Sequence, residues 1–203
     1  MALRTLLLIS LLGGAPAWSG THEEGELSRI IDDLESLAER QVWNGVDRRY
    51  EQIMALEGVT VPREIHLTAA HAARSMGDMH ATYLRLERAA KQQRTEEIDA
   101  WMREIQEDYA RVELVLEPAR SVELEAEAMP FAPDQRQQVE RAIEAMKQDG
   151  YFLGMLPEGS YFMGGERFEV IAGVDTRVDL SLKELRLQKR KKDEEPEAGI
   201  EVQ

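Results

Sequence analysis

Four histidines, His22, His66, His71 and His80, are the first candidates for metal ligands in this sequence. A metal site needs three or four ligands that converge on one point. His66 and His71 are five residues apart, which separates them by about 140° on a helix and puts them on different faces. The chain has no cysteine and no His-Glu-x-x-His motif. We therefore predict no metal site, and assign these histidines structural or solvent-facing roles.

Catalytic patterns give no better candidate. The sequence has no Gly-x-Ser-x-Gly elbow, no phosphate-binding loop and no Ser-x-x-Lys motif. Neighbouring acids such as Glu96 and Glu97, or Glu123, Glu125 and Glu127, are explained more simply as solvated positions, because ionised carboxylates prefer water unless a pocket raises their pKa. We predict no catalytic residue, no cofactor and no enzymatic activity.

Aromatic residues offer one possible binding site. Trp43 and Trp101 lie on apolar helical stripes, which places them in a core. Tyr161 and Phe162 are adjacent in a segment with strand character, so one of the two rings must point outward. An outward ring can stack on a ligand such as a sugar. Tyr161 and Phe162 are therefore the candidate binding residues.

The N-terminus has the layout of a secretory signal peptide. Arg4 is followed by an apolar run from Leu6 to Leu12 and by small residues up to Ser19. The small residues allow cleavage after Ala17 or after Ser19. A membrane anchor is the alternative, but a spanning helix needs about 20 apolar residues. We expect an exported protein without a membrane span.

Charge and cysteine content narrow the setting. The net charge is −14, and removal of residues 1–19 with Arg4 leaves 24 basic and 39 acidic residues, a net charge of −15. Such a surface repels nucleic acid and anionic lipid. Large extracellular eukaryotic domains more often contain disulfides, so the absence of cysteine favours a bacterial periplasmic protein. The 20-residue tail, 184–203, changes from basic to acidic and is expected to be disordered.

Helical periodicity extends from residue 24 to about 109. Two segments, about 24–40 and 46–56, are separated by a break at Gln41–Gly45, and two further segments are separated by Gly77-Asp78. A shift of 36 residues superposes Leu34 on Ala70, Leu37 on Ala73, Tyr50 on Leu86 and Ile53 on Ala89. The pattern predicts a helical hairpin used twice, with a third helix after the N-cap residue Thr95.

These hairpins resemble tetratricopeptide repeats, whose units have about 34 residues with small residues in both helices. The resemblance rests on Ala70, Gly77, Asp78, Leu86 and Ala89. It implies a concave surface that binds a protein partner, lined by side chains of the helices at 63–90. A bundle that only supports the second half of the chain is the alternative.

From Ala110 the period changes to two, which indicates half-buried strands at 110–116 and 122–128 with a turn at 118–121. A helix is predicted at Pro133–Lys147, closed by Gly150. Further strands follow at 151–156, 160–163, 167–171 and 176–182. Gly164-Gly165 suits a tight hairpin, since both positions need positive φ.

The segment Leu156-Pro157-Glu158-Gly159-Ser160-Tyr161, followed by Phe168-Glu169-Val170 and Val178-Asp179-Leu180, resembles carboxypeptidase-regulatory-like and PEGA-type domains. That resemblance implies a small non-catalytic β-sandwich at 110–183, from which the helix at 133–147 departs. We therefore expect an α+β protein: an N-terminal helical-hairpin array at 20–109 and a small antiparallel β-sandwich with one inserted helix. Its expected role is an adaptor or scaffold for another envelope protein, and the alternative is a carbohydrate- or peptidoglycan-binding module.

Overall fold

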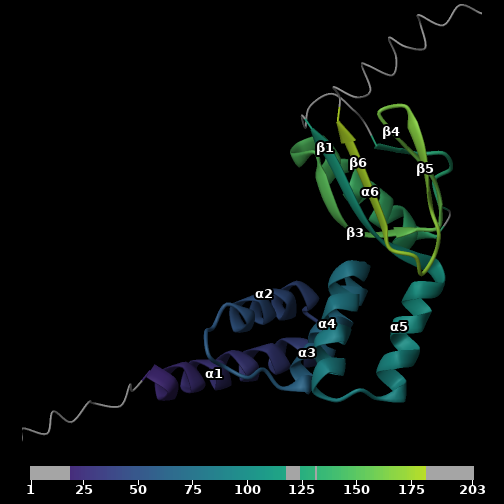
Figure 1. Cartoon of the computed structure of the whole chain (residues 1–203). Coiled ribbons are helices and arrows are strands. Elements are labelled where there is room, and N and C mark those ends of the chain that lie inside the picture. The colour runs from purple at the N-terminus through teal and green to yellow at the C-terminus, as the bar shows by residue number, and fades with distance from the viewer. Residues whose placement is uncertain (1–18, 118–123, 131, 182–203) are drawn as a thin grey trace, which may run out of the picture.

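The computed structural model describes residues 19–117, 124–130 and 132–181 (Figure 1). A helical half, residues 19–108, is followed by a sheet half, residues 109–181, so the predicted α+β class is confirmed. The predicted signal peptide apart from Ser19, the turn at 118–121 and the tail at 184–203 lie outside the described residues.

The helical half contains five helices among the described residues. Their bounds are α1 Ser19–Glu39, α2 Trp43–Met54, α3 Arg63–Ser75, α4 Met79–Gln92 and α5 Glu96–Asp108. Two of them begin with a side-chain cap: Asp78 accepts a hydrogen bond from the Ala81 amide at 2.8 Å, and Thr95 from the Ile98 amide at 3.4 Å. The predicted N-cap role of Thr95 is confirmed.

The 36-residue repeat is visible in the backbone. Helices α2 and α4 begin 36 residues apart, and α1 and α3 end 36 residues apart. The turn residues Gln41 and Gly77 both have left-handed backbones, with φ of 56° and 69°. Each turn is a Schellman motif, in which Val42 N donates to Leu37 O at 2.9 Å and Asp78 N donates to Ala73 O at 2.8 Å. Because this motif reverses the chain in few residues, the first break is shorter than predicted and Gly45 lies inside α2.

Helix α3 is buried on two sides. Ala69 and Ala72 belong to the core formed with α1 and α2, while Ala70 packs with residues of α4, α5 and the sheet half. Small side chains allow neighbouring helix backbones to come close on both sides. Helix α5 covers the second hairpin as the predicted third helix, with Ile98 and Ile105 buried and Trp101 half-buried.

The sheet half contains two three-stranded sheets. The strands are β1 Tyr109–Glu117, β2 Leu124–Ala126, β3 Tyr151–Pro157, β4 Gly159–Met163, β5 Glu166–Val170 and β6 Thr176–Ser181. Sheet A has the order β3-β1-β6, and sheet B has the order β2-β4-β5. All pairs are antiparallel except β1 and β6, which run parallel with Leu114 opposite Val178. The sheets therefore differ from the purely antiparallel arrangement expected of the sandwich.

One hydrophobic core lies between the two sheets and helix α6, Pro133–Asp149. Alternate β1 residues face this core, from Ala110 to Leu116, together with Val139 and Met146 of α6. Helix α6 ends at Gly150, whose left-handed φ of 65° turns the chain directly into β3. The predicted inserted helix and the Gly164-Gly165 hairpin, with φ of 67° and 84°, are both present.

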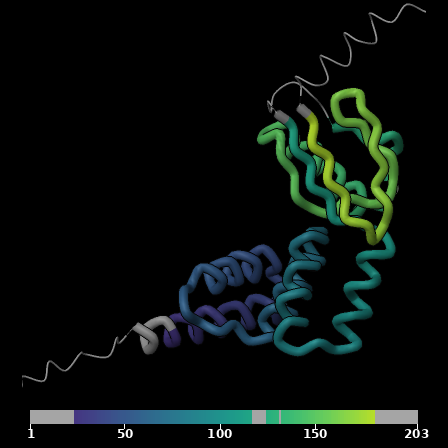
Figure 2. The backbone as a smooth tube through the Cα atoms, viewed as in Figure 1, coloured from purple at the N-terminus to yellow at the C-terminus, as the bar shows by residue number. Residues whose placement is uncertain are grey.

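The two halves are joined without a linker. Helix α5 ends at Asp108 and β1 begins at Tyr109, and the tube in Figure 2 passes directly from one into the other. The loop that carries Gly77 also meets α6: the Gln138 side chain donates to the Gly77 carbonyl, and Arg141 pairs with Asp78 at 3.1 Å. The Tyr109 hydroxyl donates to Asp134 at 3.0 Å. These contacts fix the sheet half against the second hairpin.

Candidate functional site: a groove between the helices and the sheet

Tyr161 of the predicted aromatic pair is part of the core. Its side chain is 2% exposed, its hydroxyl donates to the Pro157 carbonyl at 2.9 Å, and its ring stacks on Phe168 with centroids 5.6 Å apart. Burial raises the pKa of Tyr161 above its ordinary value. In this position the Tyr161 ring is covered and stabilises the fold of sheet B.

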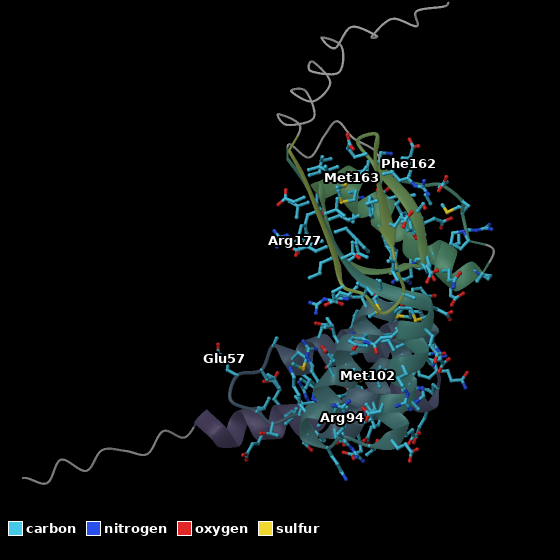
Figure 3. The ribbon with its side chains drawn as sticks, turned by 45° about the vertical axis from the view of Figure 1, so that its right-hand side comes forward. Glu57, Arg94, Met102, Phe162, Met163 and Arg177 are labelled. Atoms are coloured by element: carbon cyan, nitrogen blue, oxygen red, sulfur yellow. The ribbon has the colours of Figure 1, made fainter. Side chains whose placement is uncertain are left out.

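Phe162 is the outward ring of the pair. It is half-buried and lies opposite Glu125 of β2 and Arg167 of β5 on the outer face of sheet B. Arg167 donates to the Ser160 hydroxyl at 2.8 Å and to Glu127 at 3.2 Å. Phe162 is therefore an aromatic surface bordered by charged and hydroxyl groups. Figure 3 shows it away from Arg177, which stands at another margin of the sheet half.

The three histidines with described side chains lie in separate places. His66 is buried beside Tyr50, exposed His71 packs on Trp101 with centroids 4.5 Å apart, and His80 lies at the start of α4. Within the described part of the chain, no three His, Cys, Asp or Glu side chains are grouped closely enough to hold a metal ion.

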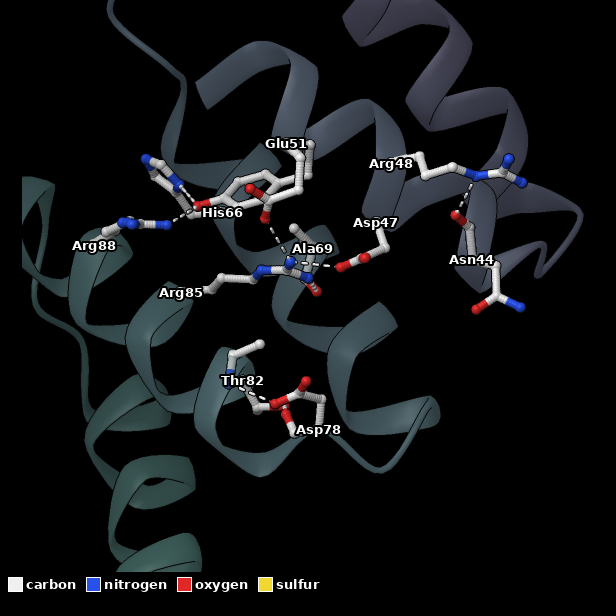
Figure 4. A network of polar contacts seen from close by, with 12 residues as sticks. Asn44, Asp47, Arg48, Glu51, His66, Ala69, Asp78, Thr82, Arg85 and Arg88 are labelled. Atoms are coloured by element: carbon white, nitrogen blue, oxygen red, sulfur yellow. Dashed lines mark hydrogen bonds and ion pairs between the residues drawn. The ribbon is translucent and has the colours of Figure 1, made fainter. Parts of the chain in front are cut away.

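A buried polar network ties α2, α3 and α4 together (Figure 4). Arg85 is 3% exposed; it pairs with Asp47 at 2.5 Å and Glu51 at 3.2 Å, and donates to the Ala69 carbonyl at 2.9 Å. Its guanidinium also lies over the Tyr50 ring, 4.5 Å from the centroid. Every partner is satisfied inside the helical half, so this network holds the two hairpins together.

The same network continues to His66. The Tyr50 hydroxyl accepts from Arg88 at 3.1 Å and lies 2.9 Å from Nδ1 of His66. Burial, and then the Arg88 charge, lower the pKa of His66, which favours the neutral imidazole; in the tautomer with the proton on Nε2, Nδ1 accepts a hydrogen bond from the Tyr50 hydroxyl. Burial raises the pKa of Tyr50. These hydrogen bonds connect α2, α3 and α4, and Arg88 is the exposed member of the chain.

A groove with unsatisfied charges lies elsewhere, where the helices meet sheet A. Its first part, which we name the junction hollow, has a volume of about 170 Å³. Residues from both halves line it: Tyr83, Glu87, Gln106, Tyr109, Arg111, Met155, Gly173 and Asp175. Gln106 donates to the Tyr83 hydroxyl at 2.8 Å and so fixes one wall.

The second part, which we name the sheet hollow, has a volume of about 210 Å³ on the outer face of sheet A. It is lined by Arg111, Glu113, Leu153, Asp175, Thr176 and Arg177. Arg177 pairs with Glu113 at 3.1 Å and with Asp179 at 3.7 Å. Arg111 and Asp175 line both hollows, so the two hollows adjoin, and we refer to them together as the groove.

Three charged side chains in this groove have no partner. Within the described residues, Glu87, Arg111 and Asp175 form no side-chain hydrogen bond and no ion pair. Their fields act on neighbouring groups: burial is the main cause of the raised pKa of Tyr83, and Glu87 and then Asp175 raise it further. Burial lowers the pKa of His80, and Arg111 contributes in the same direction. Unpaired charges in a hollow are available to a ligand.

No family model, no curated protein and no solved structure matches the chain. Across the described helices, none has the length and apolar character required to cross a bilayer.

The sequence predictions covered part of this groove. Tyr83 and Glu87 of α4 fall within the helices at 63–90 that we expected to contact a partner, but Arg111 and Asp175 were not predicted. Alternation in β1 does place Arg111 on the outer face. Asp175 lies in the loop before β6, and this loop reaches the hollow where Gly173 N donates to the Tyr109 carbonyl at 3.0 Å.

Proposed function

We propose that this chain is a non-catalytic protein-interaction module, an adaptor or scaffold exported to the periplasm of a bacterial cell envelope, and that its groove holds a polypeptide of the partner. The size of the hollows carries the proposal. Small-molecule and cofactor sites are pockets of about 300–1,000 Å³, whereas the two hollows have volumes of about 170 and 210 Å³. Each has room for one side chain of a polypeptide.

The rim of the groove also suits a protein partner. Leu153 is 38% exposed inside the sheet hollow, and Val174, next to Asp175, is 51% exposed. A protein partner can cover these apolar side chains while the charged groups remain at the polar rim of the contact. The resemblance of the helices to tetratricopeptide repeats supports the same class of function. The signal-peptide layout predicted from the sequence of residues 1–19 supports the location.

Photo-crosslinking in the native envelope tests the proposal. A benzophenone amino acid replaces Leu153 or Val174 at the groove, and Val42, which is 43% exposed in the helical half, is the control position. We expect adducts with the same partner protein from both groove positions and none from Val42. Equal labelling at all three positions, or no adduct at the groove, would contradict the proposal.

Glycan binding is the second candidate, because Phe162 presents an aromatic surface beside Arg167, Glu127 and Ser160. Sugar-binding surfaces combine a flat ring with polar groups at its border. If this candidate is right, the chain sediments with purified cell wall, Phe162→Ala abolishes sedimentation and Arg111→Gln does not. Sedimentation that survives Phe162→Ala would exclude this surface.

A further inference from the structure

We infer that the groove recognises an extended segment of the partner with a lysine or arginine side chain in the junction hollow and an apolar side chain two residues away in the sheet hollow. The inference rests on the proposed function and adds the chemistry of the bound segment. Three independent features lead to it: the spacing of the hollows, the charges of the junction hollow and the walls of the sheet hollow.

The spacing follows from the register of sheet A. The junction hollow is lined by Tyr109 and Arg111 of β1 and by Met155 of β3, which lies opposite Arg111. The sheet hollow is lined by Arg111 and Glu113, and by Leu153 opposite Glu113. The two hollows are thus displaced from each other by two residues along both strands, a distance of about 7 Å. An extended peptide repeats its side chains on one side with the same period.

The charges of the junction hollow select a cation. Glu87 and Asp175 give it two carboxylates against one guanidinium, that of Arg111, and none of the three is paired within the described residues. A lysine or arginine side chain in this hollow would balance the excess of one negative charge among its lining residues. The net charge of the chain, −14, also favours the approach of a basic segment.

Arg111 lies between the two side-chain positions because it lines both hollows. A guanidinium at this place can donate to a backbone carbonyl of the bound segment. It therefore orients the segment without requiring an acidic residue in it.

The sheet hollow suits an apolar side chain. Its charged residues Glu113 and Arg177 already satisfy each other at 3.1 Å. Arg111 and Asp175 lie where this hollow meets the junction hollow, and the rest of its wall is Thr176, the half-exposed Leu153 and the aliphatic stems of the arginines. An apolar side chain covers Leu153 without breaking an existing ion pair.

Fluorescence anisotropy with labelled peptides of nine or ten residues and the purified full chain tests the inference. The probe is Gly-Ser-Gly-Lys-Ser-Leu-Gly-Ser-Gly. One comparison peptide has Glu in place of Lys, and a second has one additional Ser between Lys and Leu. We expect the probe to bind at least about threefold more tightly than either, with affinity falling as salt rises.

Variants of the chain locate the effect. Glu87→Gln combined with Asp175→Asn is expected to remove the preference for Lys over Glu, while Glu169→Gln, a control on the outer face of sheet B, keeps it. Equal affinity for all three peptides, absence of measurable binding at millimolar concentration, or a preference that survives the double variant would overturn the inference.

The crosslinking experiment distinguishes a failure of this inference from a failure of the proposed function. If Leu153 and Val174 capture a partner but the crosslinked segment has no basic residue, the proposed function stands and the inference is wrong. If neither position captures a protein, the proposed function itself fails.

Discussion

The two helical hairpins, α1–α2 and α3–α4, share one backbone plan but fill it with different side chains. Several pairs of residues 36 positions apart are buried alike: Leu34 and Ala70, Tyr50 and Leu86, and Ile53 and Ala89 are all fully buried. Both turns use the same Schellman motif. The repeat therefore conserves which positions are buried, and it does not conserve the size of the side chains at those positions.

The difference in size follows from the neighbours of each hairpin. The first hairpin is at the end of the array and packs its large residues against itself and α3. The second lies between the first hairpin on one side and α5 and the sheet half on the other, and α3 contributes to both cores. Helix α3 needs small residues because it has close neighbours on both sides.

The largest expected effect on stability comes from exchanging the large and small side chains at equivalent positions of the two hairpins. Leu34→Ala should lower the free energy of unfolding by about 3 kcal/mol, because it leaves a cavity at a fully buried site. Ala70→Leu, at the equivalent position, should cost about 1–3 kcal/mol through overpacking. Urea denaturation measures both. If Leu34→Ala is neutral, the first hairpin is not packed as described.

The next comparison concerns two arginines 36 residues apart. Arg85→Gln should cost about 2 kcal/mol, since it removes a buried guanidinium with several partners, although Asp47 and Glu51 are partly solvated. Arg49 makes an exposed pair with Asp33 at 3.3 Å, so Arg49→Gln should change stability by less than about 0.5 kcal/mol. Equal costs in urea denaturation would show that the network does not join the hairpins.

The two turns should respond in opposite directions. Gly77→Ala should cost about 1–2 kcal/mol, because a Cβ at φ 69° is strained and would meet the side-chain amide of Gln137. Gln41 has the same left-handed backbone without glycine, so Gln41→Gly should stabilise the chain by up to about 1 kcal/mol. Thermal unfolding of both variants measures the signs, and a destabilised Gln41→Gly would refute the comparison.

The smallest expected effect is a change in how the stability of the chain depends on pH. His66 occupies the position equivalent to Ile30, and its pKa is below the ordinary value of 6.5 because of burial and then Arg88. The unfolded chain therefore binds the proton more readily, so stability is full above pH 6.5 and decreases as pH falls below it. In urea denaturation between pH 7.5 and 5, His66→Gln should give a shallower slope than the parent chain. His80 contributes in the same direction, so some slope remains. If the His66→Gln variant has the same slope as the parent chain, groups other than His66 cause the pH dependence of stability.

Local signals were the predictable part of the fold. The Thr95 cap, the Gly77-Asp78 turn, the left-handed Gly150 and the Gly164-Gly165 hairpin depend on a few adjacent residues and are all present. The parallel pairing of β1 with β6 was not predicted, because it joins segments far apart in the chain. Periodicity identifies a strand but not its neighbours.

The site was less predictable for the same reason. Tyr161 and Phe162 are both aromatic, so alternation alone did not decide which ring is buried; the pairing of β4 with β2 and β5 decides it. In sequence, Arg111 looks like any outward-facing strand residue. Arg111 shares a hollow with Glu87 and Asp175 and has no partner among the described residues. Both properties depend on how the two halves pack.

The direct passage from α5 into β1 has a mechanical consequence. Strand β1 is the central strand of sheet A, bonded to β3 on one side and β6 on the other. Tension applied through the helical half reaches β1 at Tyr109, with no slack residue between helix and strand. The load is then shared as shear across two rows of backbone hydrogen bonds. A force on one half of the chain is thus transmitted to the other half without a flexible linker between them.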